Sequence, residues 1–113
     1  MKLHDVVKAL GLAVRSGTAS LEREVTGGYA GDLLSDVIAN SQSGALWITM
    51  QVHVNIVAVA VLKDLAGIVL VEGREPADET LKKAAEEDIP ILSSSQPAFE
   101  TAGALHAILT KSP

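Results

Sequence analysis

The feature that most constrains the fold of this chain is a regular alternation of strand-like and helix-like segments from residue 45 onward. Aliphatic runs at residues 45–50, 68–71 and 90–92 have the length and composition of buried strands. Each run is followed by a segment with helical spacing or a helix-start signal. Strands that alternate with helices in this way are typical of a parallel sheet. We therefore expect one α/β domain over residues 1–113, with a mainly parallel sheet flanked by helices.

Residues 52–65 fit two kinds of element. Their many β-branched side chains favour a strand, whereas the spacing of several apolar side chains favours a helix. The residues at helical spacing are Val57, Val61, Leu62 and Leu65. We expect a helix from about Ile56, and both alternatives stay open for residues 52–55, which extend the preceding strand or start the helix.

Three further helices follow from their apolar faces and start signals. A helix over residues 3–10 places its apolar side chains on one face. Another opens at Pro76 and has acidic side chains in its first turn. The last helix, over about residues 97–109, is expected to direct Phe99 inward, and Trp47 is expected in the core because it lies within an apolar strand.

The segment between the first helix and residue 45 carries weaker signals. We expect short strands at residues 12–15 and 22–26. The glycine-rich stretch 27–31 is interpreted as a loop. Asp32 is expected to cap a helix that ends near Asn40, because an aspartate before an apolar helical face is a favourable N-cap.

The charge balance argues against a nucleic-acid-binding protein. The 113 residues include 14 acidic and 9 basic side chains, which gives a net charge of −5. Proteins that bind nucleic acids normally present a basic surface. With one Trp, one Tyr and one Phe, the chain also has few aromatic side chains on which bases could stack.

Other residue types exclude further classes of site. The chain has no cysteine, which excludes disulfides, thiolate metal sites and cysteine nucleophiles within it and fits a reducing, cytoplasmic location. The histidines, His4, His53 and His106, show no metal-ligand spacing, and we expect no metal and no cofactor. No signal peptide or membrane span is expected, because the chain opens on an amphipathic segment and polar residues interrupt its most apolar stretch.

Polar residues follow three of the predicted strands, where ligands bind in parallel α/β sheets. Helix N-termini offer free N–H groups there, and Arg74 adds a guanidinium that suits phosphate or carboxylate. The candidate residues for a small anionic or nucleotide-like ligand are Asn55, Gly73, Arg74, Ser93, Ser94 and Ser95, with His53 and Asp32 as further candidates. The alternative interpretation is that these are ordinary turn and capping residues. No set of residues predicts catalysis.

Six segments of the chain together resemble the DRTGG domain, over roughly residues 25–109. They are residues 31–37, 46–49, 55–60, 67–73, 89–93 and 99–103. Such domains stand alone or lie beside CBS-domain pairs in some pyrophosphatases and in some phosphotransacetylases, and the N-terminal domain of HPr kinase/phosphorylase has a similar fold. The resemblance implies a bacterial-type α/β module with a regulatory or oligomerising role and no catalysis of its own.

The sequence departs from the motif after which that family is named. The nearest stretch, Glu24-Val25-Thr26-Gly27-Gly28, keeps the last three letters and lacks the Asp and the Arg. The phosphate-binding loop that HPr kinase activity requires is also missing from this sequence. The resemblance therefore implies no kinase activity here.

Two hypotheses about function follow. The first is a regulatory module that binds a small anionic or nucleotide-like metabolite, forms a homodimer, or does both. The second is a pure interaction domain that docks on a partner enzyme, with the valine-rich residues 52–61 as its apolar surface. An enzyme is the least favoured of the classes considered.

Overall fold

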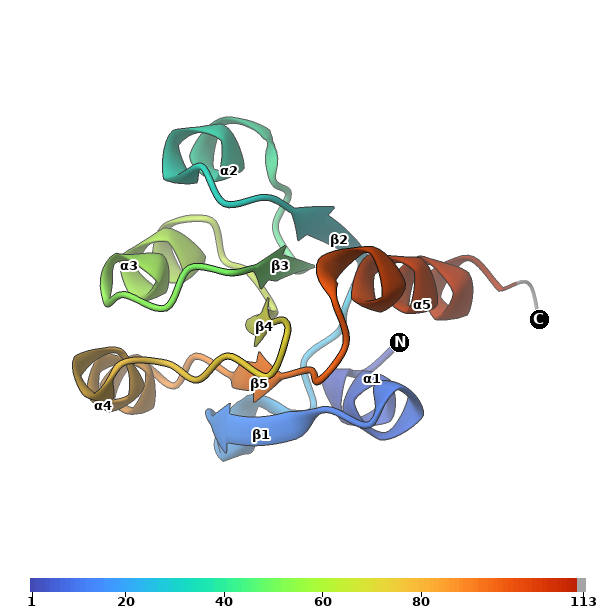
Figure 1. The fold of residues 1–113 in the computed structure, drawn as a ribbon, viewed down its shortest axis with the longest axis horizontal. Coiled ribbons are helices and arrows are strands. Elements are labelled where there is room, and N and C mark those ends of the chain that lie inside the picture. The colour runs from blue at the N-terminus through green and yellow to red at the C-terminus, as the bar shows by residue number, and fades with distance from the viewer. Residues whose placement is uncertain (112–113) are drawn as a thin grey trace.

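One mixed five-stranded sheet organises the computed structural model, which describes residues 1–111 (Figure 1). The strands are β1 (Ala13–Ser16), β2 (Gly27–Ala30), β3 (Ala45–Thr49), β4 (Gly67–Leu70) and β5 (Ile91–Ser93). They lie in the order β1-β5-β4-β3-β2, and every neighbouring pair is parallel except β1 with β5. The predicted mainly parallel sheet is therefore confirmed. Ser112 and Pro113, the last two residues of the expected domain, lie outside the described residues.

Helices cover both faces of this sheet. They are α1 (Leu3–Leu10), α2 (Leu34–Asn40), α3 (Asn55–Leu62), α4 (Asp78–Glu87) and α5 (Ala98–Thr110), with a short 3-10 turn η1 (Thr18–Ser20). Figure 1 shows α2, α3 and α4 on one face and α1 and α5 on the other. Within residues 1–111, no helix has the length and apolar character needed to cross a membrane. Because α3 starts at Asn55, residues 52–54 form neither a strand nor a helix.

The central strands bury the side chains on both of their faces. In β3, Ala45 and Trp47 pack with α2 and α3, whereas Leu46 and Ile48 pack with α1 and α5. This two-sided burial explains why the central strands are continuous apolar runs. The Trp47 side chain is fully buried, as predicted. Its indole N–H donates a 2.8 Å hydrogen bond to the Gly31 carbonyl, so its one polar atom is satisfied.

The predicted strand at residues 22–26 and the predicted loop at 27–31 are both wrong, because the strand β2 occupies the glycine tract. The cause is the close approach of α5 to this part of the sheet. A Cβ atom at Gly28 would lie 2.9 Å from Cδ2 of Leu105. The glycine lets Leu105 lie directly against the strand backbone, and the abundance of glycine here does not mark a loop.

The prediction that Asp32 caps a helix is also wrong. The N-cap position of α2 is Leu33, and no side chain caps this helix. The Asp32 carboxylate instead accepts hydrogen bonds from the Thr49 hydroxyl at 2.8 Å and from the Met50 N–H at 2.7 Å. These donors at the end of the neighbouring strand β3 hold the carboxylate away from the helix start.

Phe99 was expected to point inward, and the structure contradicts this expectation. Its side chain is 84% exposed, whereas Leu105 on the same helix is buried. At about 3.6 residues per turn, Phe99 lies about 120° around α5 from Leu105, so it falls outside the face that packs on the sheet.

Gly17 supplies a stability prediction, with Gly11 as a matched control. Both residues have left-handed φ angles, 72° and 64° respectively. A Cβ at Gly17 would lie 2.4 Å from the Pro90 nitrogen, whereas a Cβ at Gly11 has no neighbour within 4 Å. We expect Gly11→Ala to cost about 1–2 kcal/mol through backbone strain alone. Gly17→Ala should cost about 1–3 kcal/mol more because of the clash.

Urea unfolding of both variants measures this difference in the free energy of unfolding. Equal losses for Gly17→Ala and Gly11→Ala would contradict the close packing of β1 and η1 against Pro90.

Candidate functional site

The carboxyl edge of the sheet contains a point where the chain changes faces. The connections after β2, β3 and β4 lead to α2, α3 and α4 on one face, whereas β5 leads to α5 on the opposite face (Figure 1). The connections after the neighbouring strands β4 and β5 therefore lead to opposite faces of the sheet. In open α/β sheets, ligands bind in the crevice at such a switch point. Both loops that meet here, after β4 and after β5, contain residues that were predicted to bind a ligand.

Hydrogen bonds join these two loops. The Gly73 N–H donates to the Ser94 carbonyl at 2.8 Å, and the Glu72 N–H donates to the Gln96 carbonyl at 2.9 Å. The Ser93 hydroxyl donates to the Arg74 carbonyl at 3.2 Å. The structure thus brings Gly73, Arg74, Ser93 and Ser94 together, although about twenty residues separate the two pairs in the chain.

The predicted residues divide into buried and exposed groups. Ser93 and Ser94 are buried, and the Ser94 hydroxyl lies 3.0 Å from the Thr101 hydroxyl while it accepts a bond from the Gln96 N–H at 3.1 Å. The side chains of Arg74 and Ser95 are exposed. Among residues 1–111, the Arg74 guanidinium forms no ion pair. Arg74 and Ser95 are therefore the members of this group that face solvent.

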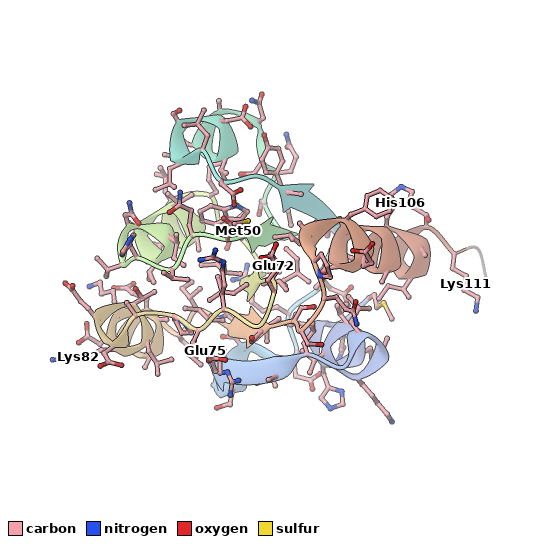
Figure 2. The ribbon with its side chains drawn as sticks, in the orientation of Figure 1. Met50, Glu72, Glu75, Lys82, His106 and Lys111 are labelled. Carbon is pink, nitrogen blue, oxygen red and sulfur yellow. The ribbon has the colours of Figure 1, made fainter. Side chains whose placement is uncertain are left out.

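The remaining candidates lie on the adjoining loops. His53 and Asn55 are exposed between β3 and the first turn of α3, and Asp32 is held at the end of β3. The strand ends are joined by a 3.3 Å bond from the Val71 N–H to the Thr49 carbonyl. Met50 and Glu72, which follow these strands, project at the centre of the view in Figure 2. No described hydrogen bond or ion pair links His53 or Asn55 to the Arg74 loop.

Two hollows of the structure lie away from this edge. One, the β2–α5 groove, has a volume of about 320 Å³ and is lined by β2, by Ile48 and by α5 residues including Leu105 and His106. The other, the α3–α4 groove, also has a volume of about 320 Å³ and lies between Val61 and Leu62 on α3 and Lys83 and Glu87 on α4. Within the described part of the chain, no three acidic or histidine side chains gather closely enough to hold a metal ion.

The residues of the β2–α5 groove were not singled out from the sequence. Gly27 and Gly28 were interpreted as loop residues, and the groove forms only when α5 lies over them. At the strand's other face, the Tyr29 hydroxyl donates to the Asp36 carboxylate, which also accepts a 2.8 Å bond from the Asn40 amide. The hydrogen bond to Asp36 raises the pKa of the Tyr29 phenol. The Tyr29 hydroxyl is thus bonded to α2, on the face of the sheet opposite the groove.

An exposed apolar surface occupies the outer side of α3. Val61 is 47% exposed and Leu62 is 67% exposed, whereas Ile56, Val57 and Val59 of the same helix are buried. The helix has no charged residue on any side. Of the apolar residues in the predicted surface 52–61, Ala58 and Val61 are exposed, and the neighbouring Leu62 extends this exposed surface beyond the predicted range.

One solved structure with a similar fold is part of a pyrophosphatase. It is the CBS and DRTGG domains of the regulatory region of Clostridium perfringens pyrophosphatase, in complex with the activator diadenosine tetraphosphate. The TM-score is 0.70 at 11% sequence identity, and the match covers 92% of this chain and 45% of that one. The present chain therefore spans less than half of that regulatory region. Among curated proteins, no relative matches the sequence.

The family assignment rests on a match to a family model. The model of the DRTGG domain matches residues 5–108, which is nearly the whole chain and extends beyond the segments that carried the resemblance. The three motif letters that the sequence keeps, Thr26, Gly27 and Gly28, lie at the start of β2. On the strength of this match and of the shared fold, the chain belongs to the DRTGG domain family.

Proposed function

We propose that this protein is a non-catalytic regulatory module that binds a small anionic or nucleotide-like ligand at the carboxyl edge of its sheet. The observation that carries the proposal is the switch point between β4 and β5, where the exposed guanidinium of Arg74 lies beside two hydrogen-bonded loops. The regulatory region of the Clostridium pyrophosphatase, which contains a DRTGG domain, was solved with a nucleotide activator, and this supports a regulatory role. The cysteine-free composition fits action in the cytoplasm.

The proposed site assigns different roles to the predicted residues. Arg74 and Ser95 contact the ligand, because a guanidinium fork and a hydroxyl suit phosphate oxygens. Ser93 and Ser94 hold the two loops in register through their buried hydroxyls. Glu72 adopts a left-handed φ of 59°, a conformation that Asp64 and Asp88 share at turns elsewhere, and it directs the chain from β4 into the Arg74 loop.

Four further residues complete this proposed edge. Gly73 donates its N–H to Ser94 and so keeps the Arg74 loop against the Ser95 loop. Asn55 and His53 face solvent on the β3–α3 connection and offer polar contacts to the far end of a nucleotide. Asp32, which is held at the end of β3 by Thr49 and Met50, is an acceptor suited to the hydroxyl groups of a ribose and not to its phosphate.

A thermal-shift experiment with Arg74→Ala tests this ligand site. The probes are inorganic phosphate, adenosine mono-, di- and triphosphate, and diadenosine tetraphosphate. We expect at least one nucleotide to raise the Tm of the wild-type protein, because a ligand of the folded state stabilises it. Arg74→Ala should abolish this rise and leave the Tm without ligand unchanged, since the side chain is exposed and unpaired.

Lys82→Ala is the matched control, because Lys82 is an exposed cation on α4 away from the strand ends (Figure 2). The control should respond to ligand as the wild type does. If a ligand raised the Tm of Arg74→Ala as much as that of the wild type, the ligand site would not be at this edge. If no probe raised the Tm of the wild type, the proposal of ligand binding would be wrong.

A second role, homodimerisation, is favoured by the outer side of α3. A helix without charged residues is normally buried on all sides, yet Ala58, Val61 and Leu62 are exposed. Lys83 and Glu87 border the α3–α4 groove and form a 3.5 Å ion pair with each other, so these two side chains present no net charge to a second copy. We propose that a second copy covers this surface; docking on a partner enzyme is the alternative.

Light scattering of Val61→Glu tests the dimer. We expect the wild type to have the mass of a dimer at micromolar concentration and Val61→Glu to have the mass of a monomer, because a carboxylate in an apolar interface must be desolvated. Phe99→Glu, which changes an exposed apolar side chain on the opposite face, should remain a dimer.

A monomeric wild-type protein would contradict homodimerisation. A Val61→Glu variant with the mass of a dimer would instead move the interface away from α3.

A further inference from the structure

The outer edge of β2 presents backbone N–H and C=O groups with which a further strand could pair. β2 is the last strand of the sheet, and within residues 1–111 no further strand pairs with its outer side. The Gly31 N–H donates to the Ile48 carbonyl at 3.1 Å, in register with the pairing of Ala30 and Ile48. Because backbone groups alternate in direction along a strand, the N–H and C=O groups of Ala30, and likewise of Gly28, point outward.

The two edges of this sheet differ in their protection. At the opposite edge, β1 has an irregular register between Val14 and Ser16, and Arg15 forms a 2.8 Å ion pair with Glu75. Bulges and charged side chains are the devices by which edge strands avoid pairing with other chains. The sequence of β2, Gly-Gly-Tyr-Ala, has no charge, no proline and no bulge. The edge at β2 is therefore open to an added strand.

The β2–α5 groove lies beside this open edge. Its lining includes Gly28 and Ala30 of β2, which have an absent or small side chain, and Leu105 of α5, which lies directly over Gly28. Its volume of about 320 Å³ is in the range of natural ligand sites. His106 projects from α5 on the side of β2 (Figure 2). A strand added to β2 would direct every second side chain toward this groove.

We propose that the β2 edge binds an extended segment of a partner protein, which adds a strand to the sheet and places apolar side chains in the β2–α5 groove. The outward N–H and C=O groups of Gly28 and Ala30 supply backbone hydrogen bonds, and the groove selects aliphatic side chains at alternate positions of the segment. A second copy fits the groove less well. If two β2 strands paired, the side chains offered to the groove would be those of Gly28 and Ala30, which are too small to fill it.

The proposed peptide site is independent of the proposed ligand site. It uses the edge of β2 and one wall of α5, and it needs neither Arg74 nor the serine loop after β5. The outcome of the nucleotide experiment therefore does not bear on it.

Selection from a library of short random peptides displayed on phage tests the proposal with the full chain as bait. We expect enrichment of peptides with aliphatic residues at alternate positions. A synthetic copy of an enriched peptide should shift the amide NMR resonances of Gly28, Ala30 and Leu105. The same peptide, N-methylated at the backbone positions that pair with β2, should bind at least about tenfold more weakly.

Two variants at one position separate the backbone contribution from the groove. Ala30→Pro removes an outward N–H and no hydrogen bond to β3, and Ala30→Trp fills the groove while it keeps the N–H. Each should weaken peptide binding by about tenfold or more. Ala107→Trp is the control, because Ala107 is exposed on α5 and does not line the groove. Circular dichroism checks that each variant is folded, and Ala30→Trp keeps the test valid if Ala30→Pro unfolds.

Three results would overturn the proposal. One is a library that yields no enriched peptide. Another is a peptide whose affinity is unchanged by Ala30→Trp and by N-methylation, which would place it elsewhere on the surface. The third is a wild-type dimer that Ala30→Pro converts to a monomer, which would show that the edge pairs with a second copy of the chain.

Discussion

Burial of β3 and β4 on both faces is the constraint on which the rest of this structure depends. Every residue of these two strands is buried, so neither face can be left to water and each needs a layer of helices. The chain supplies one layer through the connections after β2, β3 and β4. It supplies the other layer by sending α5 across to the face that α1 also covers.

The crossing of α5 creates both of the sites that we propose. Because the chain leaves β5 toward the second face, the segments after β4 and β5 lead to helices on opposite faces, while their first residues are hydrogen-bonded to each other at the strand ends. Because α5 then runs back over the sheet, it approaches β2 at Gly28 and leaves the β2–α5 groove beside it. The length and direction of one helix thus determine the surroundings of two different surfaces.

The sequence was most informative where burial decides the structure. The apolar runs of β3, β4 and β5 and the core position of Trp47 could be predicted because aliphatic composition reports burial directly. The glycine tract of β2 could not, since the local sequence contains no sign of Leu105, nearly eighty residues later, which packs directly on Gly28. Asp32 was misassigned for a similar reason, because its partners Thr49 and Met50 belong to another strand.

The location of the candidate site could be predicted from the sequence, but the burial and hydrogen bonding of its side chains could not. Polar residues after parallel strands meet at one edge in any such sheet, and this placed Arg74 near Ser93 and Ser94. The burial of both serine hydroxyls depends on how the two loops bond to each other and to Thr101. No periodicity in the sequence contains that information.

The unequal edges of the sheet also limit how this protein can assemble. When copies of one chain form a fibre through their sheets, each copy must pair with one neighbour at each of its two edge strands. Here the irregular, charged strand β1 closes one end, and only β2 remains open. Copies of this chain can therefore pair through their sheets only at the β2 edge, which excludes open-ended polymers that use both edges of the sheet.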